Sequence, residues 1–100
     1  MESSANSKNG VPIRLTVERW AHIVEEHAEL AGLQDEVLAT VSNPARIHQG
    51  GTGELLAVRE MVVGKWLVVV YREINDDGFV ITAFQTRRIA ALERRLKLWP

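Results

Sequence analysis

Histidine and arginine are the residue types in this chain that could move a proton or hold a phosphate. His27 lies in an apolar helical stripe between Ile23 and Leu30. Because imidazole titrates near neutral pH, His27 could serve as a general acid or base. The alternative is a structural histidine whose ring nitrogens are hydrogen-bonded inside the protein. His48, close to a glycine-rich turn, is a further candidate for acid–base chemistry or for contact with a substrate.

Three arginines accompany the segments that we expect to be strands. Arg59 lies in one strand, Arg72 ends the next, and Arg87 follows the last. In an antiparallel meander such positions can converge on one sheet face, and clustered guanidinium groups bind the oxygens of a phosphate bidentately. The alternative is that each arginine pairs with a neighbouring glutamate on the sheet surface. The hydroxyl and amide side chains that could join the same site are those of Tyr71, Thr82, Gln85 and Thr86.

No motif in the sequence points to a metal or a cofactor. The chain has no cysteine, which excludes disulfides and thiolate metal sites. His22 and His27 are five positions apart, whereas a zinc-binding helical pair is spaced by four. Glycine-rich phosphate loops, nucleophile elbows and dinucleotide fingerprints are also missing from the sequence. We therefore expect neither a metal ion nor a cofactor, and the polar residues named above must carry any chemistry.

The charges are unevenly distributed along a chain whose net charge is −1. Between Val17 and Glu36, six acidic residues accompany a single arginine, and between Thr86 and Pro100, five basic residues accompany a single glutamate. A protein with one basic end can attract a polyanion locally. Two solvated helix faces would give the same pattern, so the asymmetry by itself does not choose between these interpretations.

The elements that must position these residues begin with two helices. Thr16 is an N-cap candidate for a helix with an apolar period of about 3.6, and Gly32 is its natural end. A shorter helix is predicted from Gln34 to Val41, where Asn43-Pro44 stops it. The chain closes with a basic helix whose apolar stripe consists of Ile89, Leu92, Leu96 and Trp99.

Between the helices the hydrophobic period changes to about two, which indicates strands. They are predicted over residues 45–49, 54–63, 66–73 and 79–86. The run WLVVVYRE, from Trp66 to Glu73, is continuous in β-branched and aromatic residues and is typical of a central strand covered on both faces. Short turns between consecutive strands predict an antiparallel meander.

The predicted fold class is therefore α+β, with two N-terminal helices, an antiparallel meander of about four strands and a basic C-terminal helix. We expect one domain over residues 13–100, after a disordered tail over residues 1–12. No apolar run approaches the length that crosses a bilayer, so no membrane association is expected. The absence of cysteine favours a cytoplasmic location.

This layout resembles the superfamily of small metal-independent ribonucleases that includes barnase, EndoU, colicin nucleases and RelE-type toxins. The stretch RWAHIVEEHAEL, followed by a short helix and NPARI, is similar to the helical half of phage-associated nuclease domains in that superfamily. The stretch WLVVVYREINDDGFVITAFQTRRIAALERR is similar to BrnT-type toxins, with an LVVVY-type strand, an I-S-A-R-like strand and an E-R-rich helix. The resemblance covers roughly Ile13 to Trp99.

The resemblance implies an endoribonuclease that cuts RNA without a metal ion. A base removes the proton of the ribose 2′-hydroxyl, the 2′-oxygen attacks the phosphate, a cation stabilises the developing charge, and an acid protonates the leaving 5′-oxygen. Carried onto this sequence, it points to His27, to Arg59, and to Thr82 with Arg87. The sequence departs from the BrnT-like pattern at Phe84, where that pattern prefers arginine.

Two classes of function follow for this fold. In the first, a ribonuclease cuts RNA that is single-stranded or ribosome-associated, and a toxin of this kind would have an antitoxin that covers its arginines. In the second, the same fold binds a partner without catalysis, and the low net charge and few aromatic residues favour a protein over bare RNA. The candidate residues for the first class, catalytic and then substrate-binding, are His27, Arg59, Arg72 and Thr82, and Tyr71, His48, Gln85, Thr86 and Arg87.

Overall fold

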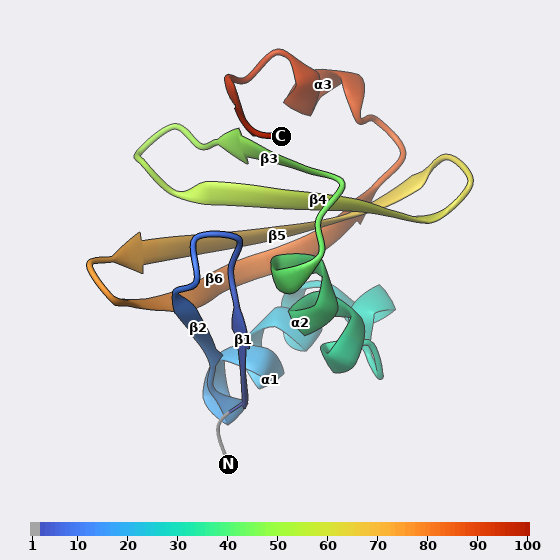
Figure 1. The fold of residues 1–100 in the computed structure, drawn as a ribbon. Coiled ribbons are helices and arrows are strands. Elements are labelled where there is room, and N and C mark those ends of the chain that lie inside the picture. The colour runs from blue at the N-terminus through green and yellow to red at the C-terminus, as the bar shows by residue number, and fades with distance from the viewer. Residues whose placement is uncertain (1–2) are drawn as a thin grey trace.

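A mixed seven-stranded sheet forms the centre of the computed structural model, which describes residues 3–100 (Figure 1). Neighbouring strands follow the order β1-β2-β6-β5-β4-β3-β7. The strands are β1 (Ser3–Asn6), β2 (Pro12–Leu15), β3 (Arg46–Gln49), β4 (Leu55–Val62), β5 (Lys65–Ile74), β6 (Asp77–Thr86) and β7 (Lys97–Trp99). The fold is α+β, but the predicted architecture is wrong, because three further strands join the meander and one pairing is parallel.

The four central strands form the antiparallel meander that the sequence pattern indicates. Each of the strands β3 to β6 pairs with the next one along the chain. Leu67 to Tyr71 in β5 are all buried, which confirms the prediction of a central strand covered on both faces. The β5–β6 turn relies on Asn75, whose φ of 57° lies in the left-handed region that asparagine tolerates.

The N-terminal segment extends the sheet on the β6 side. β1 and β2 form an antiparallel hairpin, and β2 runs parallel to the start of β6. A Cβ atom at Gly78 would lie 2.5 Å from the carbonyl oxygen of Arg72 and from Cδ1 of Ile13, so only glycine permits this close pairing. Residues 3–6 thus form a strand within the segment expected to be a disordered tail, and residues 1–2 lie outside the described part of the chain.

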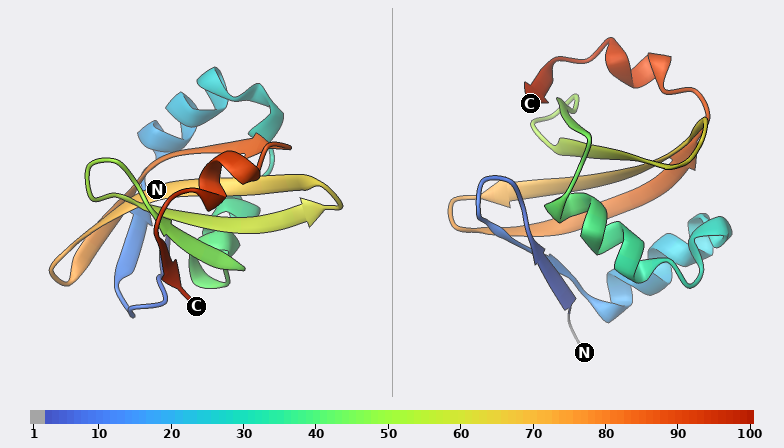
Figure 2. Two further views of the ribbon diagram at one scale, coloured as in Figure 1. Left: turned by 90° about the horizontal axis from the view of Figure 1, so that it is seen from above. Right: turned by 45° about the vertical axis from the view of Figure 1, so that its right-hand side comes forward.

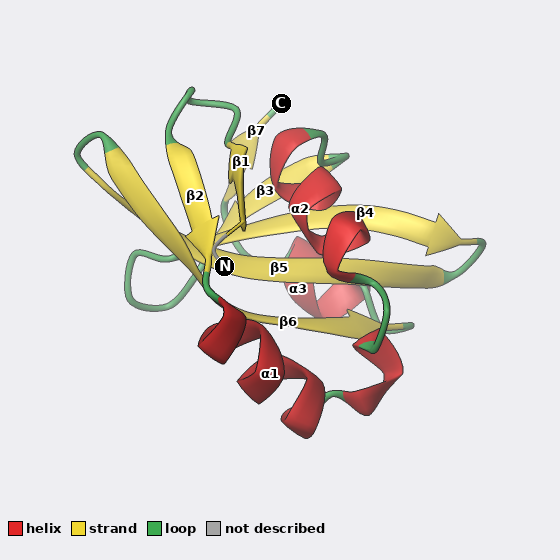
Figure 3. Ribbon diagram, turned by 90° about the horizontal axis from the view of Figure 1, so that it is seen from below, coloured by secondary structure: helices red, strands yellow, loops and turns green. Residues whose placement is uncertain are grey.

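Two helices and a 3₁₀ turn pack on one face of the sheet: α1 (Val17–Glu26), η1 (Ala28–Leu30) and α2 (Gln34–Ser42). Figure 3 shows α1 running alongside β6 and α2 crossing the middle strands. Thr16 caps α1 as predicted, since its hydroxyl accepts a hydrogen bond from the Arg19 amide at 3.0 Å. The first helix ends at Glu26, earlier than predicted, and Gly32 occupies the turn before α2 with a φ of +81°. None of the helices in residues 3–100 is long and apolar enough to cross a membrane.

The predicted C-terminal basic helix is mostly absent. α3 (Ala90–Glu93) has only four residues and buries none of them. The chain then forms β7, which pairs with β3 at the edge of the sheet, so Leu96 lies outside any helical stripe and is 64% exposed. A short isolated helix is marginal in water, whereas the open edge of β3 offers backbone partners, which explains the change of structure.

The sheet separates two apolar clusters, and the right-hand view of Figure 2 shows helices on both sides of it. We call the side of α1 and α2 the inner face, and the side of α3 the outer face. The inner cluster joins Ile13, Leu15, Ile23, Leu30, Val37, Val41, Ala57, Leu67, Val69, Tyr71, Val80 and Ala83. The outer cluster joins Leu56, Val58, Val68 and Val70, against which Trp66, Ile81, Phe84, Ile89 and Leu92 pack only half-buried. The outer cluster is therefore smaller and more open.

Candidate functional site

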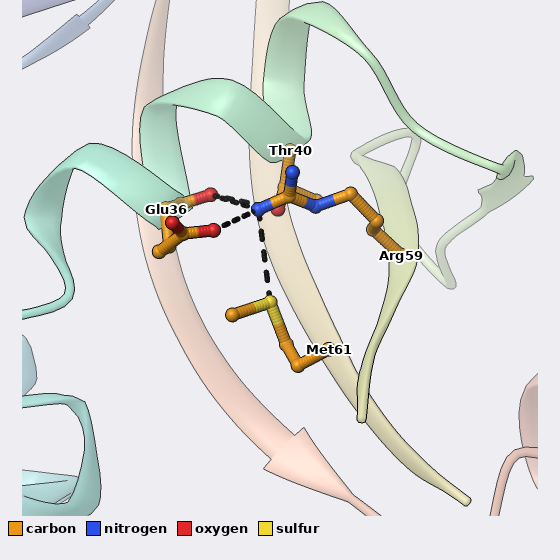
Figure 4. Close-up of polar contacts among 4 residues, drawn as sticks. All are labelled: Glu36, Thr40, Arg59 and Met61. Carbon is orange, nitrogen blue, oxygen red and sulfur yellow. Dashed lines mark hydrogen bonds and ion pairs between the residues drawn. The ribbon is translucent and has the colours of Figure 1, made fainter. Parts of the chain in front are cut away.

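Arg59 lies on the inner face, where it joins β4 to α2. It pairs across the strands with Leu67, a member of the inner cluster. Its Nη2 donates hydrogen bonds to the carboxylate of Glu36 and, at 3.3 Å, to the Glu36 carbonyl oxygen, and it lies 3.6 Å from Sδ of Met61 (Figure 4). Its side chain is 27% exposed. These contacts make Arg59 a clamp between a strand and a helix rather than a free phosphate ligand.

Arg72 lies on the other face of the sheet. It follows Tyr71 in β5, and successive side chains of a strand point to opposite faces. Its guanidinium donates to the carbonyl oxygen of Thr52 at 3.2 Å and to the Thr52 hydroxyl at 3.4 Å, which anchors the glycine-rich β3–β4 loop. Arg59 and Arg72 therefore do not converge on one sheet face, contrary to our prediction.

Tyr71 is part of the inner core and cannot meet a substrate in this conformation. The residue is fully buried, and its hydroxyl has no hydrogen-bond partner among residues 3–100. Burial, with a smaller contribution from the charge of Glu73, raises the pKa of the Tyr71 hydroxyl well above its ordinary value. A phenol that is hard to ionise and enclosed by apolar side chains has a packing role.

His27 lies where α1 meets the edge of β6. It forms the C-cap of α1, its side chain is 33% exposed, and its Nδ1 is 3.8 Å from a carboxylate oxygen of Glu29. Its ring centroid is 6.3 Å from that of Phe84, whose position in β6 is directly opposite Val68 of the outer cluster. The imidazole thus reaches the rim of the outer face at a point where solvent has access to it.

The other β6 candidates lie along the same half of the strand. Thr82 is opposite Val70, and Thr86 is opposite Trp66, so both point to the outer face, whereas Gln85 is opposite Leu67 and points inward. Arg87 follows the strand and is exposed. Within residues 3–100, β2 pairs with β6 only at Gly78 and Phe79, so this half of β6 has no strand partner on that side in the described part of the chain.

The structure therefore brings together part of the predicted site. This part consists of His27, Thr82, Thr86 and Arg87, and together with Phe84, which was not predicted as a site residue, we call it the β6-edge group. The group lacks Arg59, Arg72 and Tyr71, which lie elsewhere, because sequence spacing does not reveal which face of a twisted, bulged sheet a residue occupies. A bulge between Val70 and Tyr71 shifts the register to β6 and alters the alternation of its side chains there.

His48 is separate from that group, on the outer face of β3. It is opposite Leu56 of the outer cluster and only 2% exposed. Its Nδ1 lies 3.2 Å from the carbonyl oxygen of Arg95, while its Nε2 is buried and has no hydrogen-bond partner among residues 3–100. The stretch before β7 thus covers the histidine that we predicted to contact a substrate.

Arg46, which the sequence analysis did not select, shares this face with His48. It is opposite Val58 of the outer cluster, and its guanidinium carbon is 4.9 Å from the centroid of the Trp66 ring. Both Nε and Nη2 of Arg46 are buried and make no hydrogen bond within the described part of the chain. The available signal was the spacing of Arg46 and His48 by two in a predicted strand, which places both side chains on the same face.

A surface hollow lies near the start of α1. Thr16, Glu18, Arg19 and His22 line a space of about 380 Å³, and Arg14 and Phe79 contribute to a neighbouring space of about 240 Å³ that shares Thr16 and Arg19. Arg14 is bonded there to Asp77 at 2.8 Å. All the residues that line the first space are exposed, and an open, solvated hollow of this kind does not select a ligand.

The two faces also differ in charge. The acidic residues between Val17 and Glu36 belong to the inner layer of α1, η1 and α2, whereas the basic residues after Thr86 belong to the segment on the outer face. Because like charges gather on each face, an anionic ligand would be attracted to the outer face rather than to the inner one.

Among residues 3–100, no group of three or more potential ligands could hold a metal ion.

Comparison with known proteins identifies no relative for this chain. No family model matches it, and no curated protein and no solved structure is similar enough to count as a match. Its function must therefore be argued from the geometry of its own residues.

Proposed function

We propose that the protein is a metal-independent endoribonuclease whose reaction centre is the β6-edge group. The observation that carries this proposal is the position of His27, an accessible imidazole next to a carboxylate at the rim of the basic outer face. The Glu29 carboxylate lies 3.8 Å from Nδ1, on the side of the ring where a carboxylate stands beside the histidine in many acid–base sites. Thr82 and Thr86 lie two positions to either side of Phe84 on the outer face of β6, and the hydroxyl of one of them would donate to the phosphate.

The reaction needs only proton transfer and charge stabilisation. His27 takes the proton of the ribose 2′-hydroxyl, the 2′-oxygen forms a bond to phosphorus, and the bond from phosphorus to the 5′-oxygen breaks. A water molecule at this solvent-accessible rim protonates the leaving 5′-oxygen, so the products are a 2′,3′-cyclic phosphate and a 5′-hydroxyl. Arg87 is exposed at the end of β6, and its guanidinium would stabilise the charge on the pentavalent phosphorus group.

A binding domain without catalysis is the second candidate. The observation that favours it concerns two arginines on opposite faces of the sheet: Arg59 is bonded to Glu36, and Arg72 is bonded to Thr52. Neither cation is therefore available to a shared phosphate site. In that case the basic outer face would bind an acidic protein partner, and an antitoxin would be one such protein. A cytoplasmic location and the identity of any partner stay predictions.

The test is cleavage of a labelled single-stranded RNA in the presence of EDTA. We expect fragments with 2′,3′-cyclic phosphate ends from the unaltered protein, and a loss of rate of about 10²-fold or more for His27→Ala, as removal of a general acid–base group typically causes. His22→Ala is the matched control, because His22 is also on α1 and also lies near a glutamate, Glu26, at 3.7 Å. That variant should cut at the normal rate.

Intact RNA with the unaltered protein, or equal cutting by the His27→Ala variant, would contradict the ribonuclease. Binding of an acidic protein partner by both histidine variants, with no cleavage, would favour the binding domain instead.

A further inference from the structure

The guanidinium of Arg46 has an unsatisfied pair of donors. Nε and Nη2, which are on the same side of the planar group, are both buried and unbonded among residues 3–100. Their N–H groups point in parallel, in the arrangement that binds two oxygens of a phosphate or carboxylate. The guanidinium lies over the Trp66 ring, with 4.9 Å between the guanidinium carbon and the ring centroid. The donors are thus fixed in place without an acceptor.

His48 supplies the complementary group two positions along β3. Because the Arg95 carbonyl can only accept a hydrogen bond, the 3.2 Å contact requires the proton to be on Nδ1 of His48. In the neutral ring, Nε2 then carries a lone pair and is an acceptor. It is buried and unbonded as well. Buried polar groups in folded proteins are nearly always hydrogen-bonded, and His48 is only 2% exposed. The unpaired Nε2 therefore calls for a partner.

The geometry points to a ribonucleotide subsite formed by Arg46 and His48. The two donors of Arg46 would hold the phosphate oxygens, and Nε2 of His48 would accept a hydrogen bond from the ribose 2′-hydroxyl. A carboxylate from an acidic protein would satisfy the arginine but has no hydrogen to donate to Nε2. A ribonucleotide satisfies both groups, and a deoxyribonucleotide satisfies only Arg46.

The subsite is distinct from the reaction centre at β6. Arg46, Val58, Val68 and Phe84 form one cross-strand row on the outer face. Neighbouring strands are about 4.8 Å apart, so the Cα atom of Arg46 is about 14 Å from the Cα atom of Phe84. His27 lies beside Phe84. The inference rests on the proposed function for the identity of the ligand as RNA, and it adds a place that holds a further nucleotide of the same strand, beyond the one next to the cleaved bond.

Access to the subsite requires movement of β7, while Arg95, whose carbonyl keeps the proton on Nδ1 of His48, stays in place. β7 pairs with Ile47 and His48, and the Gln49 amide donates to the Leu96 carbonyl at 2.9 Å. Because β7 has only three residues and none of them is buried, few apolar contacts resist such a displacement. RNA binding is therefore coupled to loosening of β7.

Binding, measured apart from cleavage, tests the subsite. Fluorescence anisotropy would compare a short single-stranded RNA with the DNA of the same sequence, in a His27→Ala background so that the RNA stays intact. We expect RNA to bind more tightly than DNA, and Arg46→Gln to weaken RNA binding about tenfold or more, since it removes a charge-assisted pair of hydrogen bonds. Arg46→Lys keeps the charge but loses the paired donors, so it should be intermediate.

Arg88→Gln is the matched control, because Arg88 is an exposed cation of the same basic segment. It should reduce RNA binding no more than about twofold at physiological salt, by the loss of one screened charge. RNA binding by the folded Arg46→Gln and Arg46→Lys variants that is as tight as binding by the His27→Ala protein would overturn the subsite, and so would equal affinity for RNA and DNA. If the protein binds RNA through Arg46 but never cuts it, the subsite stands and the ribonuclease proposal fails.

Discussion

The inner and outer faces of the same sheet are packed to different degrees. On the inner face, every member of the apolar cluster is at most 1% exposed, and Nη2 of Arg59 is paired with Glu36, although Nε of Arg59 and the Tyr71 hydroxyl are buried without a partner among residues 3–100. On the outer face, Trp66 and Phe84 are half-buried, and Arg46 and His48 have buried nitrogens without partners among residues 3–100. The inner face is therefore the more closed core, and the more open outer face is the one on which we place the proposed ligand sites.

The largest expected effect comes from matched truncations on the two faces. Leu67→Ala, on the inner face, should lower the free energy of unfolding by about 2–5 kcal/mol, because it leaves a cavity in a closed core. Leu92→Ala, in α3 on the outer face, should lower it by less than about 1 kcal/mol, since Leu92 is only half-buried. Urea unfolding measures both changes. Equal losses would show that the outer cover is as firmly packed as the inner one.

A second comparison replaces one arginine on each face by methionine, which has a similar shape and no charge. Arg59→Met should lower the free energy of unfolding by about 1 kcal/mol, because it removes the partly buried clamp to Glu36. Arg46→Met should raise it by about 1–2 kcal/mol, because the removal of two buried donors without acceptors outweighs the loss of the contact with Trp66. The two melting temperatures should therefore move in opposite directions. A loss of stability in Arg46→Met would mean that the contact with Trp66 outweighs the two unbonded donors.

The smallest effect concerns the loop at the end of the outer face. A hydrogen bond from the Thr52 amide, at 2.7 Å, lowers the pKa of the Glu54 carboxyl, and the charge of Arg72 lowers it further. Since the pKa is lower in the folded than in the unfolded chain, the carboxylate stabilises the fold above its unfolded pKa of 4.5, and this contribution is lost as the pH falls through the folded value.

Glu54→Gln should accordingly reduce the melting temperature at neutral pH and have almost no effect in acid. Glu25→Gln, at an exposed position of α1, is the control and should show little dependence on pH. A difference between the Glu54→Gln variant and the unaltered protein that is constant from neutral pH to strong acid would contradict the assigned hydrogen bond.

Local patterns predicted the elements whose side chains repeat regularly. The run from Leu67 to Tyr71 predicted a central strand, and Thr16 predicted the start of α1. The helix α2 extends only one residue beyond its predicted end at Val41. The pairing of β2 with β6 had no such signal. It depends on the missing side chain of Gly78 and on the alternation of Ile13 and Leu15, which is too short to separate from a loop.

The candidate site was predictable only as a set of residue types. The sequence singled out His27, Thr82, Thr86 and Arg87, which lie around one half of β6, but it also grouped Arg59 and Tyr71 with them. The bulge in the β5–β6 pairing and the turn of the chain after Glu26 decide which of these residues share a surface. Neither feature has a period that a sequence pattern could reveal.

The sequence by itself determined the α+β class, the meander of β3 to β6, and the concentration of acidic residues before and basic residues after the sheet. These properties follow from periodicity and composition, which act over a few neighbouring residues. Only the tertiary structure decided that the two charged segments cover opposite faces, that Arg59 meets Glu36, and that nitrogen atoms of Arg46 and His48 are buried without a hydrogen-bond partner among residues 3–100. Such contacts join residues far apart in the chain, and their energies depend on the burial and register that the whole fold creates.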